Sequence, residues 1–588
     1  RSAFGIEQEF KEVEFKAHPD APIDANAHRA ILDNVRLWDT RAFHDTVTQI
    51  QALRPYYVFA DTDVDRYTID GRIRQVLLTP RELDLRQLPA ARANWINPAF
   101  IYTHGYGAVL APVSQITADG LPSLLIENAP PEVKTTSLKL TRPELYYGEV
   151  THEPVFVHTS REEFNYPSGE ANVTSRYEGK GGFPVSSFGM RLAAAINEGE
   201  PNILLTSYLT DKSRMMIHRK VADRLNELAG FLSWDPDPYL VITDEGRMVW
   251  MIDGYTTSEA HPYAHNVDVP NMGRMNYIRN AVKATIDAYD GSTHMYVFAP
   301  DDPIIAAYQR LFPDLFRSAD KMPADLRRHA RYPETLFRVQ AEVYRTYHML
   351  DPQSFYNKED LWDLARTTIS QGGSASPVTP TYVVTTLPGE EKPEFLLIIS
   401  FTPRNKDNLI GVMAARCDGE HLGEMVVLML SKQELIFGPM QIGARINQDQ
   451  NISKDLTLWN QQGSQVLRGQ MLVLPVGNTF LYVDPIYIQA TEARMPQLKK
   501  VVLAVGNRLI YADTYDSALA QLTGGAQELV TEATSTATAP VSAGKAATGD
   551  PRLGQVREHL RRYRELAAQG KWSEAGKELE AIEAAVKQ

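Results

Sequence analysis

The sequence predicts a mixed α/β (α+β) fold, and three observations lead to that prediction. Apolar runs of strand length, such as Phe395-Leu396-Leu397-Ile398-Ile399, recur from about residue 382 to 520. Apolar residues at helical spacing mark several segments of the first half. The composition, with 43% hydrophobic and 23% charged residues, is that of a globular protein. For 588 residues we expect roughly two to four packing units.

The elements follow in order from local patterns. Residues 26–54 are predicted to form a helix, followed by strands at 56–59 and 74–78. The clearest β-hairpin joins 239–242 to 248–252 through Asp244-Glu245-Gly246. Further segments have the spacing of amphipathic helices, and these are residues 185–198, 213–230, 274–289 and 303–311.

Composition shifts predict a two-lobed domain with a tethered hairpin. A mixed α/β lobe at 1–370 meets a β-rich lobe at 380–523 across a Ser/Gly/Pro-rich stretch. Residues 524–550, rich in Thr, Ala, Ser and Gly, are predicted to be a flexible linker. Residues 551–588 are predicted to form a C-terminal helical hairpin. One hairpin cannot bury its own apolar face, so we expect it to dock on the main body or on a partner.

Charge and cysteine content exclude some classes of function. A net charge of −13 argues against binding to nucleic acid, and weakly against docking on an anionic lipid surface. A single cysteine, Cys417, rules out an intrachain disulfide and a cysteine-based zinc site, but leaves the compartment open. No stretch approaches the ~18 consecutive apolar residues of a membrane helix. Because the chain begins at Arg1 and not at Met, we expect the native amino terminus to lie upstream or to have been processed.

Several sequence blocks together carry a family resemblance. They include Asp65-Arg66-Tyr67, Tyr102-Thr103-His104-Gly105-Tyr106-Gly107, Pro143-Glu144-Leu145-Tyr146-Tyr147-Gly148-Glu149 and Arg331-Tyr332-Pro333-Glu334. In combination they resemble uncharacterised protein family 0182, a family of multi-spanning bacterial membrane proteins. The resemblance implies a large domain outside the cytoplasm, at the extracytoplasmic face of the bacterial cell membrane, preceded by membrane helices. It implies no activity.

The acidic stretch Asp61, Asp63 and Asp65 alternates as the first ligands of a calcium loop do. Such a loop needs Gly at its sixth position and Glu at its twelfth, where this chain has Arg66 and Arg72. A solvated turn beside a strand is therefore the preferred interpretation, with calcium as the alternative metal. No other cofactor is predicted.

His104 lies between small residues, where glycines allow a close approach of backbone or ligand. It is a candidate general base or metal ligand, although a hydrogen-bonded core histidine in a tight turn is the preferred interpretation. Asp65 and Glu149 are the acidic groups that would act with it. Paired carboxylates act on glycosides only at separations of roughly 5–10 Å, which a sequence does not supply.

The chain shows no signature of catalysis or of nucleotide binding. We therefore expect an extracytoplasmic domain that binds or organises a cell-envelope partner. The partners expected are its own membrane helices, an envelope protein, lipid or glycan, or a second copy of the chain. Two alternatives stay open: a hydrolase or transferase that processes envelope glycan or lipid, and a calcium-stabilised assembly module.

Overall fold

The computed structural model describes residues 1–6, 10–89, 93–169, 171–368, 374–461 and 463–532, together with Arg562 and Lys577. The mixed α+β fold is confirmed. The chain divides into two compact units, residues 1–526 and 527–588. The predicted hairpin at 551–588 lies outside the described residues, apart from Arg562 and Lys577, and so does the predicted linker from residue 533 onward. The linker's first residues are helical, because α13 (Tyr515–Glu532) continues through a segment rich in helix-forming Ala, Gln, Glu and Leu.

The first unit contains four larger sheets, each named here after one of its strands. The antiparallel β4 sheet has the order β3 (Asp63–Ile69), β4 (Arg72–Pro80), β7 (Ala108–Pro112), β8 (Ile126–Glu127) and β9 (Glu132–Val133). The β18 sheet has the order β16 (Ser233–Trp234), β18 (Met248–Ser258), β21 (Tyr277–Asp287), β22 (Thr293–Val297) and β23 (Phe316–Ser318), with β17 (Tyr239–Ile242) also on β18.

The other two larger sheets draw on the second half of the chain. The β28 sheet has the order β1 (Phe10–Phe15), β30 (Met425–Leu430), β29 (Gly411–Arg416), β28 (Glu394–Pro403) and β24 (Trp362–Leu364), with β27 (Thr381–Thr385) also on β28. The β33 sheet has the order β31 (Ser464–Arg468), β33 (Thr479–Ala490), β34 (Gln497–Val505) and β35 (Arg508–Ala512), with β32 (Leu472–Val476) also on β33.

Short strands and helices surround these sheets. The smaller pairings are β2 (Tyr57–Val58) with β5 (Glu82–Leu83), β6 (Gly105–Tyr106) with β10 (Glu144–Leu145), β12 (Glu163–Ser168) with β13 (Ala171–Ser175), β19 (Val267–Val269) with β20 (Gly273–Met275), β25 (Arg366–Thr367) with β26 (Ser376–Pro377), and β11 (Val155–Val157) with β15 (Arg214–Met216) and β14 (Phe183–Pro184). The helices are α1 (Arg29–Leu32), α2 (Thr40–Gln51), α4 (Phe188–Glu198), α5 (Asn202–Leu205), α6 (Val221–Ala229), α7 (Pro303–Leu311), α8 (Ala324–Arg328), α9 (Glu334–Tyr347), α10 (Pro352–Asn357), α11 (Pro439–Gln448) and α12 (Gln450–Trp459).

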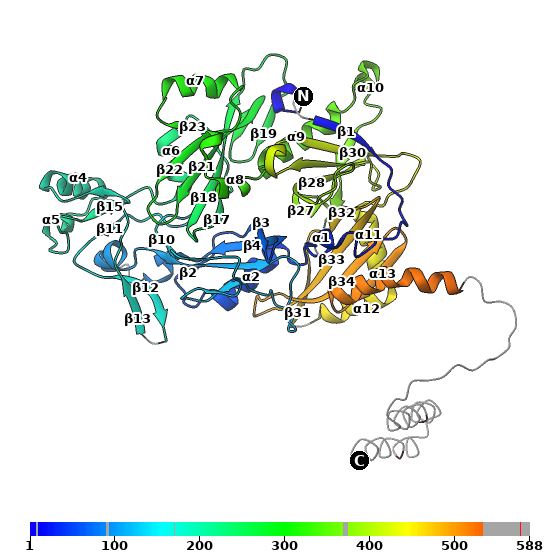
Figure 1. Ribbon diagram of the computed structural model, residues 1–588, viewed down its shortest axis with the longest axis horizontal. Helices are drawn as coiled ribbons and strands as arrows, with labels where there is room; N and C mark the ends of the chain where they lie inside the picture. The colour runs from blue at the N-terminus through cyan, green and yellow to red at the C-terminus, as the bar shows by residue number, and fades with distance from the viewer. Residues whose placement is uncertain are drawn as a thin grey trace. The chain divides into compact units, whose positions relative to one another are not determined.

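The β28 sheet joins distant parts of the chain. β1 pairs in parallel with β30, from Phe10 opposite Met425 to Phe15 opposite Leu430. The largest hydrophobic core likewise takes side chains from Ala3 through to Leu522. Figure 1 shows the blue amino-terminal strand lying along the yellow-green sheet. The division predicted near 370–380 stays a prediction, and residues on both sides of it share this core.

The predicted helix at 26–54 is wrong in its middle, where the chain leaves the helical path between α1 and α2. The backbone N–H of Leu37 donates to the carbonyl of Val113, which draws this segment onto the β4 sheet. A new helix then begins at Thr40, because the Asp39 side chain accepts a hydrogen bond from the Arg41 backbone N–H.

Two other predicted helices are corrected and three elements are confirmed. Residues 274–289 form mainly strand β21, because Val282, Ala284 and Ile286 alternate in a strand that pairs with β18 on one side and β22 on the other. Of residues 213–230, only the α6 segment is helical, while β15 takes the first part. The β17–β18 hairpin, α4 and α7 are confirmed.

Replacing Leu397 by Ala should destabilise the first unit by about 2–5 kcal/mol, because the side chain is fully buried in a central strand of the β28 sheet. Urea unfolding followed by circular dichroism measures the change. Leu350→Ala is the control, since Leu350 is 73% exposed and its loss should shift the free energy by less than about 0.5 kcal/mol. Equal effects of the two variants would contradict the assignment of Leu397 to the core.

Candidate functional site

The acidic stretch of the sequence lies mostly inside the protein, so the solvated turn predicted for it is wrong for Asp63 and Asp65. Asp63 begins strand β3, and alternate side chains of a strand share one face. On that face the Leu240 backbone N–H donates to Asp63 Oδ2 at 3.0 Å, and the Ile242 N–H donates to the Tyr67 hydroxyl at 2.9 Å. Asp63 and Asp65 are both buried, whereas Asp61 is exposed. This face of β3, which carries Asp63, Asp65 and Tyr67, therefore packs against strand β17.

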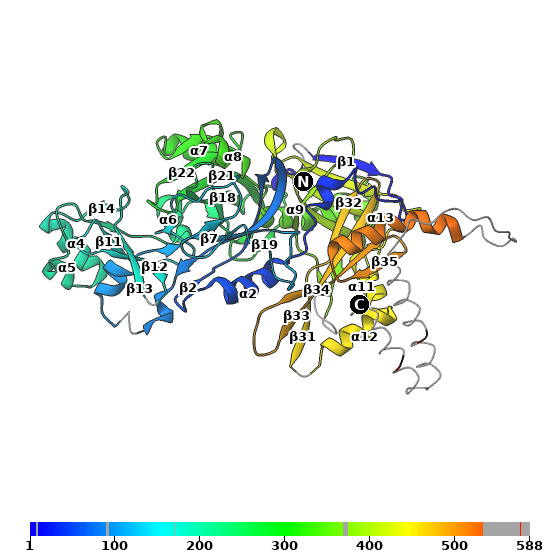
Figure 2. The same cartoon turned by 60° about the horizontal axis from the view of Figure 1, so that its bottom comes forward.

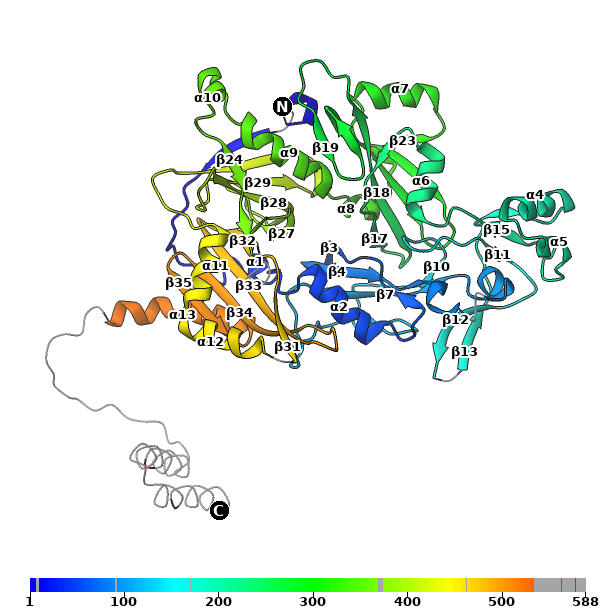
Figure 3. The same cartoon turned by 180° about the vertical axis from the view of Figure 1, so that it is seen from behind.

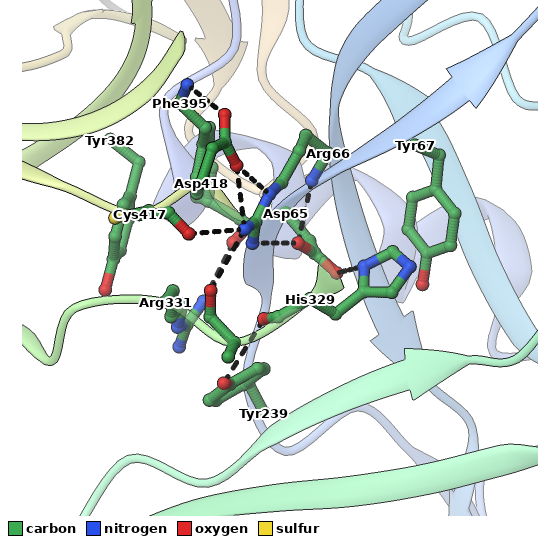
Figure 4. A network of polar contacts seen from close by, with 12 residues as sticks. Asp65, Arg66, Tyr67, Tyr239, His329, Arg331, Tyr382, Phe395, Cys417 and Asp418 are labelled. Atoms are coloured by element: carbon green, nitrogen blue, oxygen red, sulfur yellow. Dashed lines mark hydrogen bonds and ion pairs between the residues drawn. The ribbon is translucent and has the colours of Figure 1, made fainter. Parts of the chain in front are cut away.

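Asp65 forms a close pair with a histidine from a distant part of the chain. Its Oδ2 lies 2.7 Å from Nδ1 of His329, and its Oδ1 accepts a hydrogen bond from the Arg66 backbone N–H at 2.8 Å (Figure 4). Burial alone would raise the pKa of Asp65, but the neighbouring His329 and Arg66 outweigh it and hold the pKa below its usual value. Asp65 is therefore ionised at neutral pH.

The guanidinium of Arg66 connects three segments of the chain. It donates to Asp418 Oδ1 at 2.9 Å and to the carbonyls of Ala330 and Cys417 at 3.0 and 2.9 Å. Its planar group lies over the Phe395 ring, 4.8 Å from the centroid (Figure 4). Strand β3 is thereby tied to the segment after α8 and to the ends of β28 and β29. We call the set Asp65, Arg66, His329, Arg331 and Asp418 the polar junction.

Arg331 extends the polar junction toward the β17–β18 hairpin. It donates to the Val64 carbonyl at 2.8 Å, and its Nη2 lies 3.5 Å from Asp63 Oδ1 and 3.4 Å from Asp237 Oδ2. The guanidinium carbon is 4.0 Å from the centroid of the Tyr239 ring. Asp237 keeps some exposure, but reduced hydration, opposed by the charge of Arg331, raises its pKa to about 6.

Glu149 lies near the acidic residues Asp61 and Asp63. Burial, followed by the charges of Asp63, Glu82 and Asp61, raises the pKa of Glu149 to about 10. Its carboxyl group is therefore protonated at neutral pH. Glu82 itself accepts hydrogen bonds from the backbone N–H groups at 149–151, which holds the chain around Glu149 in place.

Two of the three carboxylates in the candidate calcium loop have cationic partners. Asp63 lies beside Arg331, and Asp65 beside Arg66 and His329. Within the described part of the chain, no group of three or more His, Cys, Asp or Glu residues is arranged to hold a metal ion. The geometry therefore offers no support for the calcium interpretation.

His104 is fully buried just before β6. Its Nδ1 lies 2.8 Å from the Thr103 hydroxyl, and its Nε2 lies 3.1 Å from Asn165 Oδ1. Glu163 Oε2 is 3.6 Å from Nδ1 and also accepts a hydrogen bond from the Tyr146 hydroxyl at 2.7 Å. Every polar atom of the ring thus has a protein partner, which is the arrangement of a structural core histidine.

The three catalytic candidates contact different residues. His104 contacts Glu163 and Asn165, Asp65 contacts His329, and Glu149 lies beside Glu82. Sequence reasoning missed His329, because it is 264 positions from Asp65 and stands in no recognised motif. His329, Arg66 and Tyr67 line a cavity of about 340 Å³ with Lys139 and Arg328 among its other walls.

A second feature is a set of exposed apolar side chains on the neighbouring helices α4 and α5. Its side chains are large, hydrophobic and open to solvent, and we call them the α4–α5 surface: Phe188, Met190, Leu192, Ile196 and Leu205. The pair lies at one end of the first unit in all three ribbon views (Figures 1, 2 and 3). The sequence predicts the helix but not which face the protein leaves uncovered.

Comparison with known proteins assigns the family. The profile of uncharacterised protein family UPF0182 matches residues 1–459. The chain belongs to this family. It is 85% identical to a UPF0182 protein of Solibacter usitatus over all of this chain and 65% of that protein, and 45% identical to one of Pelotomaculum thermopropionicum over 85% of this chain and 54% of that protein.

This UPF0182 chain thus spans between about half and two thirds of the length of the relatives it matches. No solved structure matches it. None of the described helices combines the length and the apolar character needed to cross a membrane.

Replacing Asp65 by Asn should lower the free energy of unfolding at pH 7 by about 3–5 kcal/mol, because Arg66 and His329 lose a buried partner. The pKa of Asp65 is lower in the folded chain than in the unfolded chain, so its ionised form stabilises the fold above the unfolded value of about 3.9. That stabilisation is lost as the pH falls through the depressed folded pKa. Urea unfolding at pH 7 and pH 2.5 should therefore show a difference between wild type and variant that shrinks in acid.

Asp244→Asn is the matched control for this prediction. Asp244 pairs with Arg328, the neighbour of His329, but both side chains are exposed. Its loss should cost less than about 1 kcal/mol. Equal losses in the two variants, or a difference that persists at pH 2.5, would refute the assigned role of Asp65.

Proposed function

We propose that this chain is the extracytoplasmic part of a longer integral membrane protein of the bacterial envelope, and that it binds or organises an envelope partner. Membership of UPF0182 supports the proposal, because the family resemblance implies a large extracytoplasmic domain preceded by membrane helices. The greater length of the matched relatives is consistent with it.

The observation that favours binding over catalysis is the α4–α5 surface. Large apolar side chains that are exposed on neighbouring elements are typical of interaction sites. Two pairs of interior titratable groups, by contrast, are in direct contact: Asp65 with His329, and Asp63 with Arg331. Groups that already satisfy each other's charge hold the fold together and are poorly placed to act on a substrate.

Cysteine labelling tests the proposed location, because the native Cys417 should contribute no signal in the folded protein. Cys417 is buried, and burial raises the pKa of its thiol to about 11, so it should resist maleimides in the folded protein. A Leu350→Cys variant of the full-length protein should be labelled by a membrane-impermeant maleimide in intact bacteria, because Leu350 is exposed. The wild-type protein should react with the maleimide only after it is unfolded. Labelling of the variant that requires cell lysis would contradict the proposed location.

A second candidate function is that of a hydrolase or transferase that processes envelope glycan or lipid. The observation that favours it is the Asp65–His329 pair at the wall of the 340 Å³ cavity. A carboxylate on Nδ1 fixes the orientation and tautomer of an imidazole and leaves Nε2 as the proton acceptor, which is the arrangement of a general base. Arg328 and Lys139 would provide positive charge for an anionic substrate group.

This candidate predicts that the chain hydrolyses p-nitrophenyl esters or glycosides and that His329→Gln lowers the rate by about 10²- to 10⁴-fold. His421→Gln is the matched control, because His421 pairs with Glu424 at 2.9 Å on the surface. Release of p-nitrophenolate measures the rate. Absence of turnover by the wild type, or equal turnover by both variants, would exclude the enzymatic candidate for these substrates.

A further inference from the structure

We propose that the α4–α5 surface inserts into the interfacial region of a lipid bilayer, which gives the domain a direct contact with the membrane. The inference rests on the proposed function, because that function places the domain beside a bilayer. The inference identifies a lipid bilayer as the partner of the exposed apolar side chains.

Helix α4 exposes its largest apolar side chains to solvent. Successive residues turn by about 100°, so Phe188, Leu192 and Ile196 lie within one narrow arc of the helix. This arc faces solvent, whereas Ala194, on the opposite side of the helix, and Ala195, beside the arc, lie in a small core. A surface helix of a water-soluble protein normally turns its largest apolar side chains inward. In α4 the two buried side chains are alanines, whereas Phe188 and Ile196 are exposed.

The helix is held rigidly in this orientation. Ser187 caps its first turn by accepting a hydrogen bond from the Met190 N–H, and Gly199 ends it in the left-handed conformation. Arg191 fixes the flank, because its guanidinium donates to the carbonyls of Val185 and Leu209 at 3.0 and 3.2 Å. The apolar face is therefore formed before it meets a partner, and binding needs little ordering.

The size of the surface favours a bilayer over a second copy of the chain. Phe188, Ile196 and Leu205 are 72%, 74% and 80% exposed, and Leu192 is 39% exposed. Together these side chains offer on the order of 400 Å² of apolar area. A stable protein interface buries roughly 800 Å² on each partner, which is about twice the apolar area that these side chains offer. Insertion of one apolar helix face to headgroup depth requires no such area.

Charge indicates the kind of lipid contact. Between Phe188 and Asn197 the only charged residue is Arg191, and its guanidinium is engaged by backbone carbonyls. The chain as a whole carries a charge of −13, which opposes attraction to anionic headgroups. Binding should therefore depend on apolar insertion, proceed on zwitterionic lipid and change little with salt.

The test is a fluorescence and flotation experiment with the 588-residue chain and vesicles of dioleoylphosphatidylcholine. An environment-sensitive nitrobenzoxadiazole dye is attached to an Ile196→Cys variant, with a Leu350→Cys variant as the control at an exposed site on another element. The buried Cys417 stays unlabelled in both. We expect the dye at position 196 to brighten when vesicles are added and the dye at position 350 to remain unchanged.

A loss-of-function variant completes the test. Phe188→Ser, Ile196→Ser and Leu205→Ser combined should lower flotation with vesicles by at least about tenfold. Leu311→Ser, Leu350→Ser and Tyr356→Ser combined remove three exposed apolar side chains elsewhere and should leave flotation unchanged. Circular dichroism verifies that both variants fold.

Three results would overturn the inference: no change of the dye at position 196, equal losses in both triple variants, or a dimer in sedimentation that only the first triple variant dissolves. The cysteine-labelling experiment in intact cells is independent of these outcomes. Labelling only after lysis would reject the proposed location, whereas labelling in intact cells without vesicle binding would reject the lipid contact alone.

Discussion

The structure depends above all on the buried guanidinium of Arg66. A charge in the interior is tolerated only when its partners satisfy it, and Arg66 has Asp65 beside it in β3 and Asp418 beyond the end of β29. The carbonyls of Ala330 and Cys417 complete the set of acceptors. These partners come from three separate segments, so they must be brought together before the charge can be buried. These contacts fix the position of the β4 sheet relative to the β28 sheet.

The same constraint determines what the neighbouring acids can do. Asp63 and Asp65 face Arg331, His329 and Arg66, and their oxygens are engaged by protein groups. Glu149, which has no such cation, stays protonated instead. Asp63 and His104 thus contribute mainly to the cohesion of the fold. The Asp65–His329 pair is the exception, because His329 also borders a cavity.

The outer surface shows the opposite arrangement. Inside the unit, apolar side chains fill the core and the charged groups of the polar junction are paired. At α4 and α5, apolar side chains are exposed while an arginine lies against the backbone. An apolar surface in water is unfavourable and is retained where it has a binding role. The interior of this protein therefore supplies rigidity, and its exposed helical end supplies the contact.

The sequence by itself determined the fold class, the family, the β17–β18 hairpin and the helices α4 and α7, because local periodicity and turn residues depend only on near neighbours. It did not distinguish strand from helix at 274–289, where small and apolar residues fit both periods and pairing with β18 decided. Nor did it place Asp65 beside His329 or leave Phe188 uncovered. Those outcomes depend on contacts between segments hundreds of positions apart, and on which helix face the rest of the chain covers. Only tertiary packing decides them.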